Sequence, residues 1–276
     1  MGSLGGTLWV VATPIGNLED MTHRATRVLA TVGRVLCEDT RRTRTLLDHF
    51  GIADKALVRF DAHAEKDRID EVLSWLEHGE DLALVSDAGT PGINDPGERL
   101  VRAAAAKGFR IIPVPGPSSV IAAVSVSGLG GGGFSFGGFL PKGSEALRTK
   151  LAGLSPGVWV FFAPARDLRD VVESMAMVST VGQVVIGREL TKLHETIYRG
   201  DAQALVSRLE GDDEALLGEA VLVFEVIEAP LTDEVIEGLL REQLASGKSS
   251  KAAVEAVAGA LGLPRRRVYQ LALKLG

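Results

Sequence analysis

Two turns rich in glycine and proline limit what this chain can fold into. The first, S-D-A-G-T-P-G-I-N-D-P-G, runs from Ser86 to Gly97, and the second, V-P-G-P-S-S, runs from Val114 to Ser119. Each follows an apolar run that predicts a buried strand and precedes a stretch that predicts a helix. Glycine lets the backbone approach a ligand closely, and proline fixes φ. Two such turns at the carboxyl ends of neighbouring strands predict the wall of a small-molecule crevice in an α/β domain. Ordinary tight loops are the alternative, although most connections span only about 2–6 residues.

The composition is typical of a soluble globular protein. The 276 residues, 46% of them hydrophobic and 24% charged, suit one large or two medium domains. No apolar run reaches ~18 residues, so no membrane span is expected, and the amino terminus lacks the pattern of a signal peptide. Because Cys37 is the only cysteine, we expect no intramolecular disulfide, no cysteine-based zinc site and a reducing cytoplasm.

Charge is distributed unevenly along the chain. The net charge of −6 disfavours bulk nucleic-acid binding, but Arg241 to Gly276 holds seven basic residues against two acidic ones. That segment carries +5, so the rest of the chain carries −11. A second basic cluster, with six arginines, lies between His23 and Arg44. Local basic patches matter more than the total charge for a polyanionic partner.

Strand and helix signals alternate along the first half, which predicts a mostly parallel sheet with helices on both faces. The expected strands span 7–13, 34–38, 56–60, 82–85 and 111–114, and the expected helices span 22–32, 41–50 and 66–78. A second α/β set follows, with strands at 157–163, 183–187 and 220–227 and helices at 167–177 and 201–209. The tail from Thr232 predicts three helices.

The expected organisation is two α/β domains and a helical appendix. We place an N-terminal α/β domain at 1–120, a C-terminal α/β domain at 121–230 and a helical tail at 231–276. The polyglycine run from Gly130 to Gly133 is expected to be a hinge or the end of a linker, because regular structure is costly for glycine.

Several familiar motifs fail, and no metal site is expected. Gly128, Gly130 and Gly133 match G-x-G-x-x-G, but a strand-like segment follows them where a helix is required. Gly247-Lys248-Ser249 lacks the first glycine of a phosphate-binding loop, and no G-x-S-x-G element is present. The five histidines are scattered, so each is expected on a surface or a helix face.

Five polar segments follow the ends of predicted strands and are expected to converge. In an open α/β sheet, the ligand site lies beyond the carboxyl ends of the strands. The segments are T-P-I-G-N-L-E-D (13–20), E-D-T-R-R-T (38–43), the two turns described above and G-R-E-L-T-K-L-H-E-T-I-Y-R-G (187–200).

These segments, with C-E-D-T-R-R-T, G-F-L-P and R-E-L-T-K, resemble the ribosomal RNA small subunit methyltransferase I family. The resemblance runs from about Leu8 to the end of the chain. It implies two α/β domains of the tetrapyrrole-methylase type, with S-adenosylmethionine in the cleft between them and a homodimer as the assembly. It also implies 2′-O-methylation of a cytidine ribose in 16S rRNA, in the decoding region of the small ribosomal subunit. The chain departs from the family's F-Y-E-S-P-H-R at Phe161 to Arg166, which here is F-F-A-P-A-R.

The Gly/Pro turns suit a donor with an adenosine moiety, because backbone amides and carbonyls can read adenine and ribose. The expected cofactor-binding residues are Pro14, Gly16, Asp87, Ala88, Gly89, Thr90, Pro91, Pro117, Ser118 and Ser119. Asp87 is expected to contact a hydroxyl or the sulfonium, or else to cap its turn. Ser118 and Ser119 are expected to donate to the donor's carboxylate at a helix amino terminus, a role compatible with helix capping.

A ribose hydroxyl is a poor nucleophile, so a positioned base assists its deprotonation. The candidate catalytic residues are Glu38, Asp39, Glu189 and Lys192. Paired carboxylates at a strand end can instead simply bind Arg41 or Arg42. This alternative to catalysis stays open for any single candidate. Much of the rate can also come from alignment of donor and acceptor.

The tail predicts a helix-turn-helix. A helix capped by Ser249 or Ser250 ends near Gly262, and Pro264 opens a second, basic helix. The expected RNA-binding residues are Arg41, Arg42, Arg44, Arg265, Arg266 and Arg267. A helical cap packed on the body, with a solvated basic face, is the alternative. For the whole chain, the alternatives are a small-molecule (tetrapyrrole) methyltransferase and a non-catalytic RNA-binding or ribosome-assembly protein.

Overall fold

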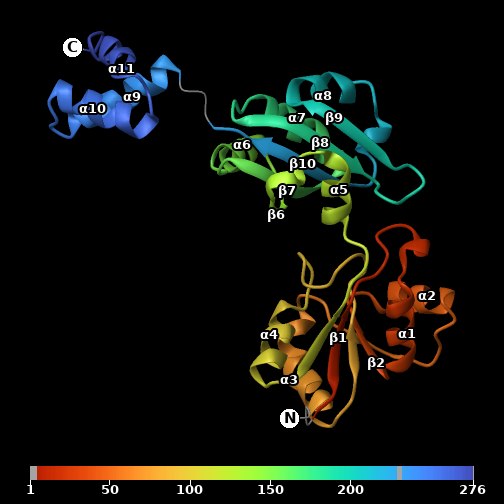
Figure 1. The fold of residues 1–276 in the computed structure, drawn as a ribbon. Helices are drawn as coiled ribbons and strands as arrows, with labels where there is room; N and C mark the ends of the chain where they lie inside the picture. The colour runs from red at the N-terminus through yellow and green to blue at the C-terminus, as the bar shows by residue number, and fades with distance from the viewer. Residues whose placement is uncertain (1–4, 229–231, 276) are drawn as a thin grey trace. The chain divides into compact units, whose positions relative to one another are not determined.

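The computed structural model describes residues 5–228 and 232–275. The chain forms two compact units, Met1–Val226 and Ile227–Gly276. The first unit holds two five-stranded sheets, and the second holds three helices (Figure 1). The boundary expected between residues 230 and 231 lies outside the described residues.

The first sheet is parallel throughout, with strand order β3-β2-β4-β1-β5, as the alternation of strand and helix signals predicts. Its strands are β1 (Thr7–Val11), β2 (Arg34–Cys37), β3 (Ala56–Arg59), β4 (Leu82–Leu84) and β5 (Arg110–Val114). The helices between them are α1 (His23–Thr31), α2 (Thr40–His49), α3 (Ala64–Glu77) and α4 (Glu98–Ala106), with a 3-10 turn η1 (Leu18–Asp20) before α1.

Helices cover both faces of the first sheet, so its three inner strands β2, β4 and β1 are largely buried on both sides. Apolar side chains of α1 and α2 pack with Val11, Val35 and Val85 on one face. Those of α3 and α4 pack with Leu8 and Leu36 on the other. Figure 1 shows the two helix pairs on opposite sides of β1. Burial on both faces is the reason that these strands are nearly continuous apolar runs.

The second sheet is mixed, with strand order β6-β7-β10-β8-β9. Only β6 and β7 pair in parallel, and the other neighbours are antiparallel. Its strands are β6 (Ser135–Phe139), β7 (Gly157–Pro164), β8 (Val181–Arg188), β9 (Thr196–Asp201) and β10 (Glu219–Val226). The helices are α5 (Ser119–Ser127), α6 (Ser144–Ala152), α7 (Leu168–Ala176) and α8 (Ala202–Leu209), and the 3-10 turns are η2 (Gly130–Gly132), η3 (Ala165–Asp167) and η4 (Glu214–Leu216).

Helix α5 packs on the second sheet although it directly follows β5 of the first. Val120 and Ala123 form a core cluster with Val160, Val185 and Val223 from the strands. Helices α6, α7 and α8 contribute to the cluster on the opposite face. The expected boundary between residues 120 and 121 therefore falls inside this helix. The polyglycine run forms a single 3-10 turn, closed by a 3.1 Å hydrogen bond from Gly133 N to the carbonyl of Gly130, and its role as a hinge or the end of a linker stays a prediction.

The C-terminal unit consists of α9 (Asp233–Ala245), α10 (Ser250–Leu261) and α11 (Arg265–Ala272), as predicted. Ser249 caps α10 by accepting a 3.3 Å hydrogen bond from Ala252 N, and Gly262 ends that helix in a left-handed conformation. Pro264 is the residue before α11 rather than its first residue. Eight buried side chains, including Ile236, Val257 and Val268, form the core of this unit. Within the described segments, no helix is long and apolar enough to cross a membrane.

Candidate functional site

Three of the predicted segments meet beyond the carboxyl ends of β1, β4 and β5. Thr13 and Gly89 exchange two backbone hydrogen bonds of 2.9 and 3.0 Å. Thr13 Oγ1 donates to the carbonyl of Ser86 at 3.0 Å, and Thr90 Oγ1 donates to the carbonyl of Pro117 at 3.2 Å. These bonds hold the loop after β1 and both Gly/Pro turns as one rigid edge.

Gly89 occupies a position that other residues fill only with strain. Its φ is +83°, and a Cβ added there would lie 3.4 Å from Ile15 Cγ2. Glycine adopts this conformation without steric cost. The turn therefore brings backbone, rather than a side chain, to the cavity described below.

The segment after β2 is fastened to the first turn through Asp87. Asp39 N donates to Asp87 Oδ1 at 3.0 Å, and Asp87 N donates to Glu38 Oε1 at 3.3 Å. Arg42 Nη1 lies 3.5 Å from Asp87 Oδ2. Asp87 thus joins two loops with its carboxylate.

Several carboxylates lie on this wall, and the pKa values of Glu38 and Asp95 are raised. Burial raises the pKa of Glu38, the hydrogen bond from Asp87 N opposes the rise, and the charges of Asp95 and Asp87 add to it. Burial likewise raises the pKa of Asp95, with a further contribution from the charge of Asp87. A half-buried carboxyl with a raised pKa is the form of acid that suits proton transfer near neutral pH.

A second wall comes from the loop after β8. Lys192 Nζ donates to Glu189 Oε1 at 2.8 Å and lies 3.3 Å from Glu219 Oε2. Glu189 Oε1 also accepts from Glu219 N at 3.0 Å. Burial acts to raise the pKa of Glu189, but the hydrogen bonds from Lys192 Nζ and Glu219 N outweigh it and hold that pKa below its usual value. Burial acts to lower the pKa of Lys192, but its two carboxylate partners raise it overall. Lys192, Glu189 and Glu219 thus form an ion-pair network that stabilises their charged forms.

The loop after β1 lies directly against this second wall. A Cβ added at Gly16 would lie 2.9 Å from Thr191 Oγ1 and 3.2 Å from the carbonyl oxygen of Leu190, and it would collide with the Lys192 stem. Glu189 and Thr191 themselves have φ of +49° and +66°, which is strained for residues other than glycine. The close approach explains why a glycine stands at position 16.

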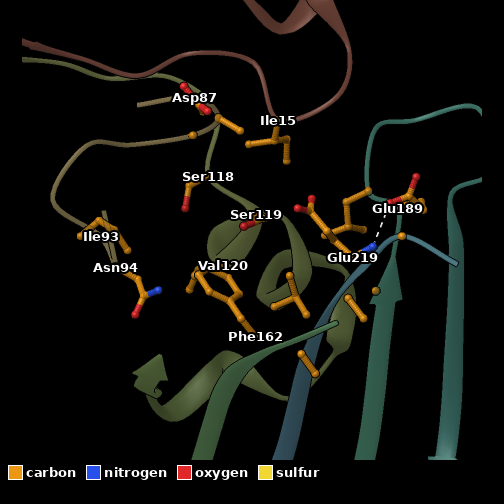
Figure 2. A pocket seen from close by; sticks show the side chains of 18 of the residues that line it. Ile15, Asp87, Ile93, Asn94, Ser118, Ser119, Val120, Phe162, Glu189 and Glu219 are labelled. Atoms are coloured by element: carbon orange, nitrogen blue, oxygen red, sulfur yellow. Dashed lines mark hydrogen bonds between the residues drawn. The ribbon is translucent and has the colours of Figure 1, made fainter. Parts of the chain in front are cut away.

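The two walls enclose a cavity of about 560 Å³, a volume within the ~300–1,000 Å³ usual for small-molecule sites. Figure 2 shows Ile93 and Asn94 on one side of it and Glu189 and Glu219 on the other, with Ser118 and Ser119 between. The predicted site residues that line it are Glu38, Arg42, Asp87, Ala88, Gly89, Thr90, Ser118, Ser119, Glu189 and Lys192. Those that do not line it are Pro14, Gly16, Asp39, Arg41, Arg44, Pro91, Pro117 and the three arginines of the tail.

Ser118 acts as the cap of α5 and lines the cavity at the same time. Its Oγ accepts a 3.5 Å hydrogen bond from Ile121 N. Ser118, Ser119 and Val120 all face the cavity, so it receives the amino terminus of α5, which favours anions. The capping role and the ligand role proposed from the sequence are compatible here.

Some of the remaining predicted residues have other partners. Asp39 caps α2 by accepting from Arg41 N at 2.8 Å, and Arg41 Nη2 donates to its other carboxylate oxygen at 2.8 Å. The Arg41 guanidinium holds the pKa of Asp39 well below its usual range. Arg44 Nη2 donates to the carbonyl of Lys55 at 3.1 Å. For Asp39 and Arg41, pairing with each other is what the geometry favours.

Sequence reasoning missed the aromatic part of the cavity. Phe139 at the end of β6 and Phe162 in β7 both line it, and their ring centroids are 5.4 Å apart. They are register partners on parallel strands, and Phe139 is 57% exposed. The G-F-L-P and F-F-A-P-A-R segments held the only signal for them. Ala163, Pro164 and Arg166 of the latter segment also line the cavity, so the departure from the family pattern lies in the site.

Residues 5–228 and 232–275 contain no group of three or more His, Cys, Asp or Glu side chains placed to hold a metal ion. The cavity is lined by carboxylates, a lysine, two arginines, an amide, hydroxyls, backbone groups and aromatic rings. Such a site suits a small organic molecule that carries both charged and apolar parts.

Comparisons with known proteins agree with this fold. The family model of the Tetrapyrrole (Corrin/Porphyrin) Methylases matches residues 7–206, which defines the class. The solved uroporphyrin-III C-methyltransferase of Thermus thermophilus, complexed with S-adenosylhomocysteine, has the same fold. It superposes with a TM-score of 0.53 at 18% identity, covering 80% of this chain and 97% of that one.

Curated sequences narrow the class. A Ribosomal RNA small subunit methyltransferase I from Xylella fastidiosa strain Temecula1 is 41% identical, over 97% of this chain and 99% of its own. The protein of that name from Escherichia coli O157:H7 is 37% identical, over 98% and 95%. The chain belongs to the ribosomal RNA small subunit methyltransferase I family.

Proposed function

We propose that this enzyme transfers a methyl group from S-adenosylmethionine to the 2′-hydroxyl of a cytidine in 16S rRNA, in the decoding region. The observation that carries the proposal is the 37–41% identity, over nearly the full chain, to small-subunit rRNA methyltransferases. The cavity is built largely from the segments that resemble this family. A homodimer in the cytoplasm, acting on the small ribosomal subunit, is part of the same proposal.

The cavity has the properties that the donor needs. Gly89 presents backbone because its φ is positive, so a flat adenosine moiety can approach closely. The carboxylates of Asp87 and Asp95 suit a sulfonium cation and ribose hydroxyls, and the amino terminus of α5 at Ser118 suits a carboxylate. We infer that the Asp87–Thr90 and Ser118–Ser119 segments hold the donor, with Pro14, Gly16, Pro91 and Pro117 shaping the loops behind them.

When bound, S-adenosylmethionine supplies an electrophilic methyl group. The residues of this chain then have to hold the acceptor hydroxyl in line and take its proton. We infer that Glu38 takes the proton, because it lines the cavity, is half-buried and has a raised pKa. Arg42, which also lines the cavity, neutralises the neighbouring Asp87 and so limits the repulsion that ionised Glu38 experiences.

Glu189 and Lys192 have a positioning role in this proposal. Their ion pair, with Glu219, fixes the strained loop that lies against Gly16 and forms the second wall. Its lowered pKa makes Glu189 a weaker base than Glu38. Phe139 and Phe162 give the cavity an aromatic surface on which a nucleobase can stack.

The proposal is tested by the acceptor that receives the methyl group. Purified protein is incubated with radiolabelled S-adenosylmethionine and, in parallel reactions, unmethylated 30S subunits, deproteinised 16S rRNA and uroporphyrinogen III. We expect label in the RNA of at least one of the first two reactions and none in the porphyrinogen. Label only in the porphyrinogen supports the tetrapyrrole alternative. No transfer, with RNA still bound, supports a non-catalytic RNA-binding protein.

A further inference from the structure

A second cavity, of about 390 Å³, lies between helices α10 and α11 of the C-terminal unit. It is lined by Lys251, Val254, Glu255, Arg265, Arg266 and Tyr269. Val254 is buried, and Tyr269 is 53% exposed. The cavity thus combines an apolar residue and an accessible aromatic ring with three cations and one carboxylate.

The cations of this cavity are not equivalent. Arg265 Nη1 lies 3.1 Å from Glu255 Oε1, so that pair is internally neutralised. Over residues 5–228 and 232–275, the structure gives Lys251 and Arg266 no carboxylate within ion-pair distance. Two positive charges therefore remain beside Tyr269 for a ligand.

The third arginine of the run serves another purpose. Arg267 Nη2 donates to Asp233 Oδ1 at 3.0 Å, which ties α11 to α9. Arg267 does not line the cavity. The three consecutive arginines are thus divided between an internal pair, the cavity and a contact between helices.

An aromatic ring beside unpaired cations is the pattern of single-strand nucleic-acid sites, where a base stacks on the ring and phosphate contacts the cations. Duplex RNA fits less well, because its major groove is too deep and narrow for side chains to read. We propose that this cavity binds one unpaired nucleotide of an RNA strand, with the base on Tyr269 and the phosphate at Lys251 and Arg266. That the ligand is RNA rests on the proposed function. The inference adds that the bound RNA is single-stranded and names the residues that bind it.

The test uses the full-length protein and a fluorescein-labelled single-stranded RNA of twelve nucleotides, with 2-aminopurine at one position, titrated at several salt concentrations. Tyr269→Ala is expected to raise Kd about 5- to 150-fold, which is the value of one stacked base. Tyr269→Phe keeps the ring and is expected to retain most of the affinity and the 2-aminopurine quenching. Arg266→Ala is expected to flatten the slope of log Kd against log salt by roughly 0.7, the value for one phosphate contact on a single strand.

Lys274→Ala is the matched control, because Lys274 is an exposed cation of the same unit that does not line the cavity. It is expected to change the slope less than Arg266→Ala does. Circular dichroism and calorimetric affinity for S-adenosylmethionine should be unchanged in every variant, since the variants lie outside the first unit. A duplex RNA of equal length is expected to bind more weakly and to be insensitive to Tyr269→Ala.

The inference is overturned if Tyr269→Ala and wild type bind the single strand equally, or if the duplex binds more tightly. Methyl transfer to 30S subunits is measured on the same preparations. If the wild type methylates 30S subunits but RNA binding does not depend on Tyr269, the nucleotide site is contradicted and the proposed function stands. Tyr269-dependent binding with no transfer to any RNA contradicts the proposed function and leaves the nucleotide site standing.

Discussion

At the scale of single residues, Glu38 bears most of the proposed chemistry. Glu38→Gln keeps an oxygen that can accept the hydrogen bond from Asp87 N but removes the base. We expect methyl transfer to fall roughly 10²- to 10⁴-fold, the usual contribution of general base catalysis. Steady-state kinetics with saturating donor measures this, and calorimetry should find the donor affinity little changed. A large loss of donor affinity at unchanged kcat assigns Glu38 to donor binding instead.

The effect of Glu38→Gln on the free energy of unfolding has a sign that follows from the pKa of Glu38. Because the folded-state pKa of Glu38 is raised, folding takes up a proton between its unfolded and folded pKa values. The associated stability is present at low pH and is lost as pH rises through that window. At pH 7 the ionised carboxylate therefore opposes folding, so Glu38→Gln should leave the protein at least as stable as wild type in urea.

A pH profile tests the electrostatic part of the argument. Activity requires ionised Glu38, so the rate should fall as pH drops through a pKa that lies above the ordinary value of ~4.3. Asp95 is one of the charges that raise the pKa of Glu38. Asp95→Asn should therefore move the acidic limb of kcat to lower pH. A limb that stays in place, or moves to higher pH, shows that another group sets it.

Gly89 tests the place of the donor. Gly89→Val puts a β-branched side chain at φ +83° and next to Ile15, where backbone is proposed to face the ligand. Donor affinity measured by calorimetry should drop strongly. Gly92, at φ +79° with open space around it and outside the cavity lining, supplies the control Gly92→Val, which carries the same backbone strain. Equal affinities in folded Gly89→Val and Gly92→Val would argue against this position.

At the scale of elements, a buried glutamate anchors the first Gly/Pro turn. Gly97 precedes α4 and offers no side chain to cap it, while Glu65 of α3 is only 7% exposed. Glu65 Oε1 accepts from Gly97 N at 3.1 Å and from Arg99 N at 3.2 Å. A carboxylate from another helix thus replaces the missing cap and fixes the end of the turn that lines the cavity.

Removing this anchor should cost stability. Glu65→Ala leaves the buried N–H of Gly97 and the part-buried N–H of Arg99 without their acceptor, so we expect a loss of about 2–3 kcal/mol in the free energy of unfolding. Glu65→Gln keeps the acceptor oxygen and should lose clearly less. Urea denaturation of the two variants measures the difference. If both lose the same small amount, the anchor contributes little.

Most elements could be predicted from local sequence, and the exceptions have physical causes. Strands such as 82–84 are short apolar runs between turn residues, which is a local signal. By contrast, β9 alternates weakly within a polar loop, and α6 lies in a charged stretch with a weak apolar face. Strand direction is set by pairing between distant residues, so nothing near β10 indicated that it runs antiparallel to both neighbours.

The site also has a part that local sequence predicts and a part that it does not. The loops at Ser86–Gly97 and Val114–Ser119 were predictable because glycine and proline mark them, and they line the cavity or support it. Phe139 and Phe162 become neighbours only through the register of β6 and β7. The pairing of Asp39 with Arg41, and of Arg267 with Asp233, depends on side-chain geometry that a sequence does not contain.

At the scale of the whole molecule, the two units have different proposed roles. The first unit holds the cavity with its carboxylates and Gly/Pro turns, and the second carries a separate cationic and aromatic cavity. Variants of the cavity in the second unit, such as Tyr269→Ala, should therefore change the apparent KM for RNA at each salt concentration and leave donor affinity unaltered.

The central claim is methylation of a ribose oxygen by this chain, and the nucleoside product tests it most directly. Unmethylated 30S subunits are incubated with the protein and S-adenosylmethionine, the 16S rRNA is digested to nucleosides, and the products are identified by mass spectrometry. A methyl group on ribose also blocks alkaline cleavage at that linkage. We expect 2′-O-methylcytidine, formed far more slowly by Glu38→Gln. A base-methylated nucleoside, or no methylated nucleoside with fully folded protein, contradicts it.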